Sequence, residues 1–192
     1  RIEENKFVIL LPGRLTKWKG QENFVESLNV LVEDHQQYDF QAIILGSDQG
    51  RNVYSKKIKN LVERYNLNNK IKFVEHYSEM PIAYSVANLV ISSSIEPEAF
   101  GRVAVEAQAM QKVIVASNIG GSKETVINGK SGFLYKADDP RDLAKAINNV
   151  MELDKEALYS IGNEGRKNVS KKFNVENMCQ TTLREYNKLL NI

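Results

Sequence analysis

Two carboxylates, Glu98 and Glu106, flank the start of a predicted helix, and this stretch holds the residues best suited to chemistry. Glu98 lies in a loop that follows the apolar run Leu89–Ile91, and the pattern becomes helical only after Gly101. A helix N-terminus exposes unpaired backbone N–H groups and the positive end of a dipole, which suits phosphate. Glu106, one turn into the helix, can accept hydrogen bonds from hydroxyls beside that phosphate. A phosphate flanked by hydroxyls is the chemistry of a nucleotide sugar.

Both carboxylates also have a plainer interpretation. Arg102 and Glu106 stand at i and i+4 and could form a surface ion pair, while Glu98 could stabilise the helix N-terminus. The segment 102–110 is apolar almost all round, so we expect it to be buried, with a specific partner for its carboxylate.

A basic loop follows the first predicted strand. The apolar run 7–11 ends at Pro12–Gly13, and Arg14, Lys17 and Lys19 come next. The guanidinium and the ammonium groups at a strand end can bind one anionic group together. The alternative is that these side chains are ordinary solvated cations on the surface. The loop has neither a Walker motif nor a Gly-x-Gly-x-x-Gly fingerprint, so its spacing alone does not identify a nucleotide.

The elements that must position these residues alternate along the chain. Strands are predicted at 7–11, 41–45, 71–74, 89–92, 113–116 and, as the edge strand, 133–135. Helices are predicted at 24–32, 54–65, 80–86, 102–110, near 124–127 and at 139–151, with further helical segments over 154–192 that break near Phe173–Asn174. This order predicts an α/β fold, a doubly wound Rossmann-like parallel sheet with helices on both faces. Such folds bind ligands beyond the carboxyl ends of their strands.

Composition narrows the function classes. The 192 residues fit one domain with a sizeable core. Basic and acidic residues, 26 and 24, are spread along the chain, which gives no strong electrostatic case for nucleic acid and does not exclude weak membrane contact. No apolar run could span a bilayer, and no His and Cys cluster suggests a metal. The single cysteine, Cys179, cannot form an internal disulfide, which favours a reducing cytoplasm, and we expect it to be packed.

Several short motifs, in this order, resemble the C-terminal, donor-binding domain of the retaining family-4 glycosyltransferases, which have the GT-B fold. The resemblance covers essentially the full length of the chain. It rests on Gly13-Arg14-Leu15 with Lys19-Gly20, Ser92-Ser93, Glu98-Ala99-Phe100-Gly101 with Glu106, Ala116-Ser117 with Gly120-Gly121 and Glu124, Asn128-Gly129, and Gly132-Phe133-Leu134. Each motif is weak by itself, and the ordered set is highly specific.

The resemblance implies catalytic roles for three side chains. Arg14 and Lys19, next to Gly13, would hold the donor diphosphate and stabilise charge on the leaving group. Glu98 would face the hydroxyls of the transferred sugar. The two carboxylates would then not act as a pair of general acid and base, as they do in a glycoside hydrolase.

The resemblance also assigns the rest of the donor site. Phe100 and Gly101 would place backbone N–H groups beside Glu98, and Arg102 and Val103 would offer theirs to a phosphate. Glu106 would accept the ribose hydroxyls.

The loop that contains Glu75 and His76 would edge the base, although a solitary histidine can also be an ordinary polar residue. Two departures from the family pattern stand out. Glu75 occupies a position that is often glycine, which leaves the base open, and Gln111–Val113 replaces a usual glycine and proline before the strand.

The implied reaction moves a hexosyl unit, with anomeric retention, from a nucleotide diphosphate sugar to a glycan or lipid-linked acceptor in cell-surface polysaccharide or glycolipid synthesis. No cofactor or metal is required. Residues 1–172 would bind the donor, and 173–192 would form a helix that crosses to an acceptor-binding N-terminal domain.

The sequence starts at Arg1 and soon enters a strand, so we expect a piece of a longer enzyme, inactive when isolated. We expect the enzyme in the cytoplasm or at the inner face of the membrane. The alternatives are a GT-B-fold nucleotide-sugar epimerase and a non-catalytic nucleotide-binding module.

Overall fold

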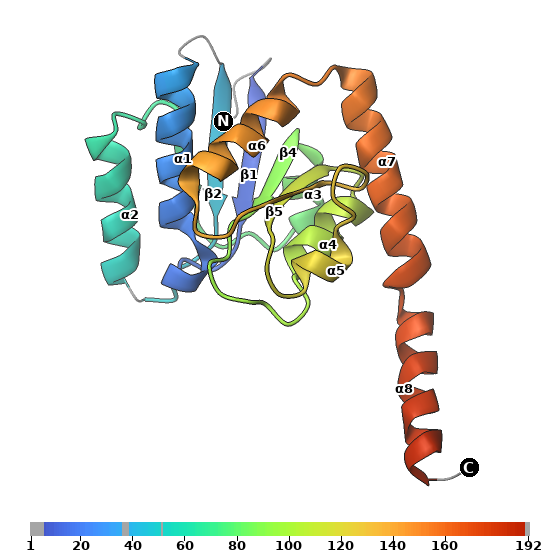
Figure 1. Ribbon diagram of the computed structural model, residues 1–192. Helices are drawn as coiled ribbons and strands as arrows, with labels where there is room; N and C mark the ends of the chain where they lie inside the picture. The colour runs from blue at the N-terminus through green and yellow to red at the C-terminus, as the bar shows by residue number, and fades with distance from the viewer. Residues whose placement is uncertain (1–5, 36–38, 51, 191–192) are drawn as a thin grey trace.

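A parallel sheet forms the centre of the computed structural model, which describes residues 6–35, 39–50 and 52–190 (Figure 1). Within these ranges its strands are β1 (Phe7–Pro12), β2 (Phe40–Leu45), β3 (Ile71–Val74), β4 (Leu89–Ser92), β5 (Val113–Ser117) and β6 (Phe133–Tyr135). Each one coincides with a segment that the sequence predicts to be a strand. The central strands β1, β4 and β5 are apolar on both faces because helices cover both sides of the sheet, whereas β3 contains Lys72 and is only partly buried.

The strands lie in the order β3-β2-β1-β4-β5-β6, and every neighbouring pair is parallel. The chain builds outward from β1 to β3 and then returns to the other side of β1 to build β4 to β6. The doubly wound sheet and the edge position of β6 are therefore confirmed. The reversal between β1 and β4 is a topological switch point, where the loops that leave two adjacent strands diverge and open a crevice.

Helices cover the two faces of the sheet in separate groups (Figure 1). The chain contains a 3-10 helix, η1 (Lys17–Lys19), and the α-helices α1 (Gln21–Asp34), α2 (Asn52–Arg64), α3 (Met80–Ser85), α4 (Arg102–Ala109), α5 (Ser122–Thr125), α6 (Pro140–Met151), α7 (Lys155–Lys172) and α8 (Val175–Leu190). Helices α1, α2 and α6 pack on alternate strand residues such as Ile9 and Leu11. Helices α3 and α4 pack on the intervening residues, such as Leu10 and Val90. The period of two in the strands thus divides the core into two apolar clusters.

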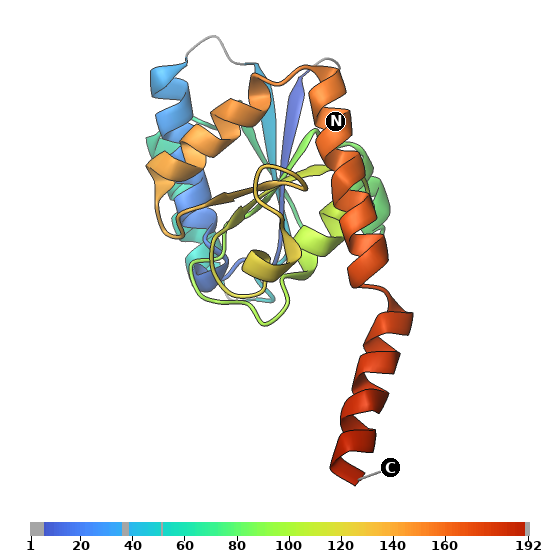
Figure 2. The same ribbon diagram turned by 45° about the vertical axis from the view of Figure 1, so that its right-hand side comes forward.

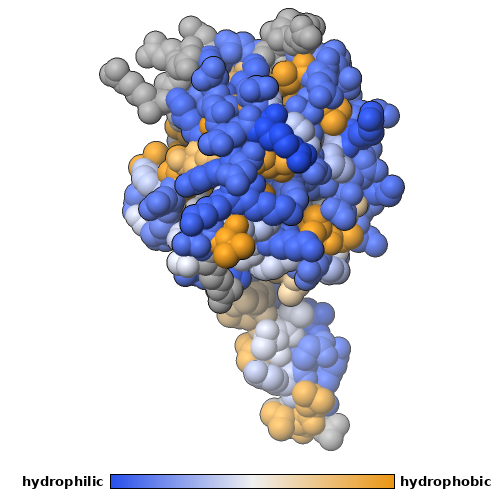
Figure 3. Space-filling view, turned by 90° about the vertical axis from the view of Figure 1, so that its left-hand side faces the viewer, coloured by the Kyte–Doolittle hydropathy of each residue, from blue (hydrophilic) through white to orange (hydrophobic). Residues whose placement is uncertain are grey.

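The two C-terminal helices, α7 and α8, differ from each other in how they pack. Helix α7 packs along α4, and the chain then breaks at Phe173–Asn174, as the sequence predicts, before α8 extends away from the sheet (Figure 2). None of the described residues of α8 is buried, and hydrophobic atoms are visible on this protruding segment (Figure 3). Its exposed apolar side chains are Val175, Met178, Leu183, Tyr186, Leu189 and Leu190.

The expectation that Cys179 is packed is wrong, because none of the described residues of α8 is buried and the thiol is exposed. No helix within the described ranges has the length and apolar character to cross a bilayer.

Candidate functional site

A cleft of about 630 Å³ opens at the carboxyl edge of the sheet, beside the switch point between β1 and β4. Ligand sites of small molecules have volumes of this order. Four loops or helix starts line it, those that follow β1, β2, β3 and β4. The lining residues are Pro12, Gly13, Arg14, Trp18, Lys19, Leu45, Gly46, Ser47, Gln49, His76, Tyr77, Met80, Tyr84, Glu98, Ala99, Phe100, Gly101, Arg102, Val103 and Glu106. All the site residues predicted from the sequence, except Glu75, therefore meet in one cleft.

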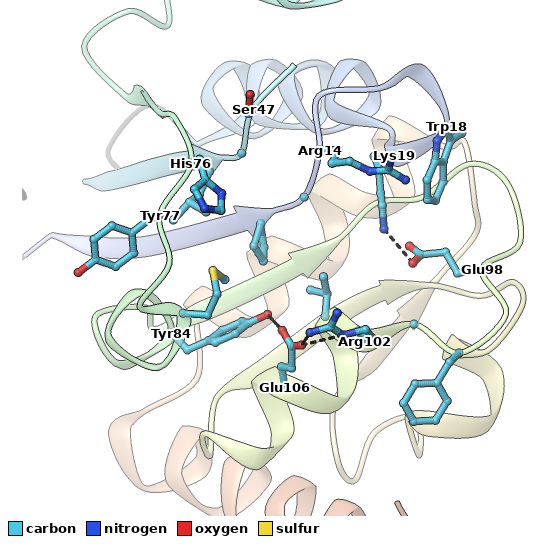
Figure 4. A pocket seen from close by; sticks show the side chains of 18 of the residues that line it. Arg14, Trp18, Lys19, Ser47, His76, Tyr77, Tyr84, Glu98, Arg102 and Glu106 are labelled. Carbon is cyan, nitrogen blue, oxygen red and sulfur yellow. Dashed lines mark hydrogen bonds and ion pairs between the residues drawn. The ribbon is translucent and has the colours of Figure 1, made fainter. Parts of the chain in front are cut away.

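One end of the cleft is built around Glu98 (Figure 4). The Lys19 Nζ lies 2.8 Å from the Glu98 Oε2, and the two side chains are only 14% and 16% exposed. The Ser94 hydroxyl donates a hydrogen bond to the other carboxylate oxygen, Oε1. Both oxygens of Glu98 thus have partners, which holds the carboxylate and the ammonium in a fixed arrangement.

The β1 loop reaches this position because its backbone is attached to the β4 loop. The Ile95 N–H donates to the Trp18 carbonyl at 2.9 Å, and the Ser93 hydroxyl donates to the Lys19 carbonyl at 2.9 Å. Gly20 adopts a left-handed backbone, with φ of 69°, and a Cβ there would stand 1.9 Å from the Ser93 carbonyl oxygen. The Lys19–Glu98 pair therefore requires glycine at position 20.

A second pair of glycines supports the Glu98 loop from the opposite side. The Gly121 N–H donates to the Glu98 carbonyl at 2.8 Å, and a Cβ on Gly120 would lie 2.5 Å from that same oxygen. The sequence indicates that Gly120–Gly121 allow a close approach to whatever fills the crevice. In the structure they approach the backbone of the Glu98 loop itself, so their effect on the cleft is indirect.

Trp18 lies beside two cations of the β1 loop, Arg14 and Lys19, and no function was predicted for it from the sequence. Its ring lies 4.4 Å from the Lys19 Nζ and 6.0 Å from the Arg14 guanidinium carbon. The negative face of an indole attracts cations, which offsets part of the repulsion between two like charges placed close together. An aromatic residue directly beside a predicted phosphate-binding lysine was the available signal.

The other end of the cleft is built around Glu106. Its Oε1 accepts hydrogen bonds from the Arg102 guanidinium at 2.8 and 3.1 Å, and its Oε2 accepts one from the Tyr84 hydroxyl at 2.8 Å. Burial and the neighbouring carboxylate raise the pKa of Tyr84, so its hydroxyl remains a donor. Glu106 thus forms the i,i+4 ion pair with Arg102 and also lines the cleft.

Helix α4 is less buried than its composition predicts. Only Ala104, Ala107 and Gln108 are buried among its residues, and the Glu106 side chain is 33% exposed. The expectation that this helix is buried all round is wrong because one of its sides faces the cleft instead of the core.

The N-terminus of α4 points a cluster of backbone donors at the cleft. Its N-cap, Gly101, has a φ of 77°, and no side chain caps the helix. The first backbone N–H groups of an α-helix have no partner within the helix, so those of Arg102 and Val103 are available to an anion. Phe100, on the preceding loop, is exposed and packs edge-on against Phe173 at the α7–α8 break, with ring centroids 5.7 Å apart.

The β3 loop forms the side of the cleft that faces Glu98 from across the sheet (Figure 4). His76 and Tyr77 line the cleft there, next to Ser47 from the β2 loop. Glu75 does not line it and contacts a separate cavity of about 130 Å³ beside Asp48. Among the described residues, no three acidic, histidine or cysteine side chains gather as metal ligands would.

The chain is similar to proteins of known sequence and structure. A family model described as glycosyl transferases group 1 matches residues 1–168. The capsular polysaccharide biosynthesis glycosyltransferase CapM of Staphylococcus aureus is 27% identical, over 96% of this chain and 49% of its own length.

Two solved structures resemble the chain closely. A glycosyltransferase from Rickettsia africae ESF-5 has a TM-score of 0.90 and 33% identity, over 98% of this chain and 49% of that one. Anabaena HepE, crystallised in complex with UDP-glucose, has a TM-score of 0.87 and 30% identity, over 96% and 49%. The chain spans about half the length of these relatives.

Proposed function

The chain belongs to the glycosyl transferases group 1 family, and we propose that it is the donor-binding half of a GT-B enzyme that uses a nucleotide diphosphate sugar. One observation carries the proposal. The cleft places two cations, an uncapped helix N-terminus and two carboxylates around a single space at the switch point of the sheet. These groups complement the parts of such a donor, namely its phosphates and the hydroxyls on either side of them.

The diphosphate would bind between the β1 loop and α4. The side chains of Arg14 and Lys19 supply positive charge from one side, next to Gly13, and the N–H groups of Arg102 and Val103 supply donors from the other. Because Lys19 is already held by Glu98 and Trp18, its charge is in place before the bond to the sugar breaks. A preorganised charge of this kind stabilises a leaving diphosphate without reorganisation.

The sugar and the ribose would occupy opposite ends of the cleft. Glu98 retains free lone pairs beyond those used by Lys19 and Ser94, and these can accept hydrogen bonds from the hydroxyls of the transferred hexosyl unit. The N–H groups of Phe100 and Gly101, which also line the cleft, would lie beside it. Glu106 would accept the ribose hydroxyls.

The base would lie along the β3 loop, with His76 at its edge. Glu75 would contribute through its backbone alone, because its side chain belongs to the neighbouring cavity.

We propose that the complete enzyme transfers the hexosyl unit with anomeric retention to a glycan or lipid-linked acceptor, without a required metal. CapM, by its name a capsular polysaccharide glycosyltransferase, supports an acceptor in cell-surface polysaccharide or glycolipid synthesis. The UDP-glucose in the HepE complex supports a nucleotide sugar as donor. We expect the reaction in the cytoplasm, including the inner face of the membrane.

An acceptor-binding N-terminal domain would complete the enzyme. The segment 173–192, which contains α8, would cross to that domain, and α8 would bury the apolar side chains that it exposes here. Residues 1–172 would remain the donor-binding unit. Without the second half, the chain should bind donor weakly and should not transfer.

Binding of nucleotides to this chain is the first test. The chain contains one tryptophan, Trp18, and it lines the cleft, so its fluorescence reports occupancy directly. Titration with UDP, GDP and ADP should give a saturable change with at least one of them. The matching monophosphate should bind about tenfold more weakly, because it lacks one of the charges that the β1 loop contacts. If none of the three diphosphates gave heat or a fluorescence change, the result would contradict the proposed donor site and would favour a non-catalytic module that merely keeps the fold.

A second measurement separates transfer from epimerisation. In the complete enzyme, a transferase should release nucleotide diphosphate only when an acceptor is present. Interconversion of two nucleotide sugars without acceptor would support the epimerase.

A further inference from the structure

Tyr84 connects the core of the protein to the Glu106 end of the cleft. Its side chain is 2% exposed and belongs to the apolar cluster beneath α3 and α4. Its buried hydroxyl points toward the cleft and donates to the Glu106 Oε2 at 2.8 Å (Figure 4). The residue therefore has a fixed ring and a single direction for its hydroxyl.

A phenylalanine would fill the same apolar space, so the hydroxyl needs its own explanation. A buried hydroxyl is unfavourable unless it has a hydrogen-bond partner. Here the partner is a carboxylate, which makes the bond charge-assisted and stronger than one between neutral groups. The pair is thus a specific feature of the cleft and not a requirement of core packing.

The two oxygens of Glu106 are held very differently. Oε1 is held by Arg102, whose side chain is 84% exposed and free to exchange with water. Exposed i,i+4 ion pairs of this kind hold their side chains weakly. Oε2 is held by a buried ring that cannot move without disturbing the core. Tyr84 therefore decides the orientation of the carboxylate.

We propose that Tyr84 is a positioning residue which orients Glu106 toward the two ribose hydroxyls, so that the cleft selects ribonucleotides over nucleotides that lack these hydroxyls. The inference rests on the proposed function and adds a determinant of its specificity. A carboxylate can accept from two neighbouring hydroxyls at once only when its plane faces both. Without Tyr84, the carboxylate can rotate toward Arg102 and solvent, and this arrangement is lost.

The test compares matched ligands and matched variants of the full chain. Calorimetry measures the dissociation constants of UDP, GDP and ADP, each beside its 2′,3′-dideoxy form. The variants are Tyr84→Phe and, as a control, Tyr135→Phe. Tyr135 is also 2% exposed, lies outside the cleft lining, and has a hydroxyl without a hydrogen-bond partner among the described residues.

We expect wild type to bind the ribonucleotide about tenfold or more tightly than its dideoxy form. Tyr84→Phe should lower the affinity for the ribonucleotide by about tenfold and change the affinity for the dideoxy form by no more than about twofold. Tyr135→Phe should change neither affinity. An equal loss of affinity for both ligands would show that Tyr84 acts only through the core. This result would overturn the inference about Tyr84 but not the proposed function. No binding of any diphosphate by wild type would overturn the proposed function as well.

Thermal unfolding supplies a measurement that needs no ligand. Glu106→Ala should lower the Tm by about 2–4 °C, because it leaves the Tyr84 hydroxyl buried without an acceptor. Adding Tyr84→Phe to that variant should recover most of the loss, since the unpaired group is then removed. Additive losses in the double variant would show that the two side chains do not act together.

Discussion

Each end of the cleft contains one carboxylate, and the two carboxylates differ in burial and in the origin of their ion-pair partners. Glu98 is enclosed, and its partner Lys19 comes from a loop far away in the sequence. Glu106 is half-exposed, and its partner Arg102 comes from the same helix, one turn earlier. The first pair exists because β1 and β4 are adjacent in the sheet. The second ion pair could form in an isolated helix.

This difference indicates a division of labour. Groups that stabilise charge in a transition state benefit from being fixed in advance, in a site from which water is excluded. Groups that recognise a ligand must stay accessible to it even when one oxygen is positioned, as Tyr84 positions Glu106, and an exposed partner such as Arg102 can exchange with that ligand. Under the proposed function, the enclosed end would serve the reaction and the open end would serve binding.

The largest effect should come from Gly20→Ala, which would break the enclosed end. The new Cβ would stand 1.9 Å from the Ser93 carbonyl oxygen, in a left-handed backbone that alanine adopts with strain. We expect a loss of about 3 kcal/mol or more in the free energy of unfolding, and a decrease of about 6–12 °C in Tm. Differential scanning calorimetry measures this.

Gly129→Ala is the matched control, because Gly129 has a similar φ of 74° and open space around its Cβ position. It should lose only about 1 kcal/mol from backbone strain. Equal losses for the two variants would mean that the contact between the β1 and β4 loops does not matter.

A smaller effect should come from Lys19→Gln, which removes the cation of the enclosed end. The affinity for the nucleotide diphosphate found by titration should decrease by about tenfold or more, equal to about 1.4 kcal/mol per factor of ten. Lys17→Gln is the control, since Lys17 is an exposed cation of the same loop and lies outside the cleft lining. Similar losses for both variants would show that only the total charge of the loop counts.

The smallest effect should come from Arg102→Ala at the open end. Its ion pair with Glu106 is exposed, so we expect a loss of about 0.5 kcal/mol or less in the free energy of unfolding, which fades in about 1 M salt. Urea unfolding at low and high salt measures it. A loss above about 1 kcal/mol in the free energy of unfolding that persists at high salt would show that the Arg102–Glu106 pair is not the weaker of the two ion pairs.

Much of the fold could be predicted from the sequence because its signals are local. Continuous apolar runs such as 7–11 and 113–116 predict buried parallel strands, and Asp139–Pro140 predicts the start of α6, where the Asp139 carboxylate accepts the Asp142 N–H. The expectations that failed depend on what lies next to a segment. Cys179 is exposed because α8 extends away from the sheet (Figure 2), and α4 is half-buried because one side faces the cleft.

The sequence by itself determined the order of the strands along the chain and which loops carry cations, carboxylates and glycines, because residue type and hydrophobic period are properties of short segments. Only the tertiary structure decided which of these groups meet. The pairing of β1 with β4 brings Lys19 to Glu98, and the packing of α3 on the sheet brings Tyr84 to Glu106. Contacts between residues distant in sequence depend on the whole fold, and no local pattern encodes them.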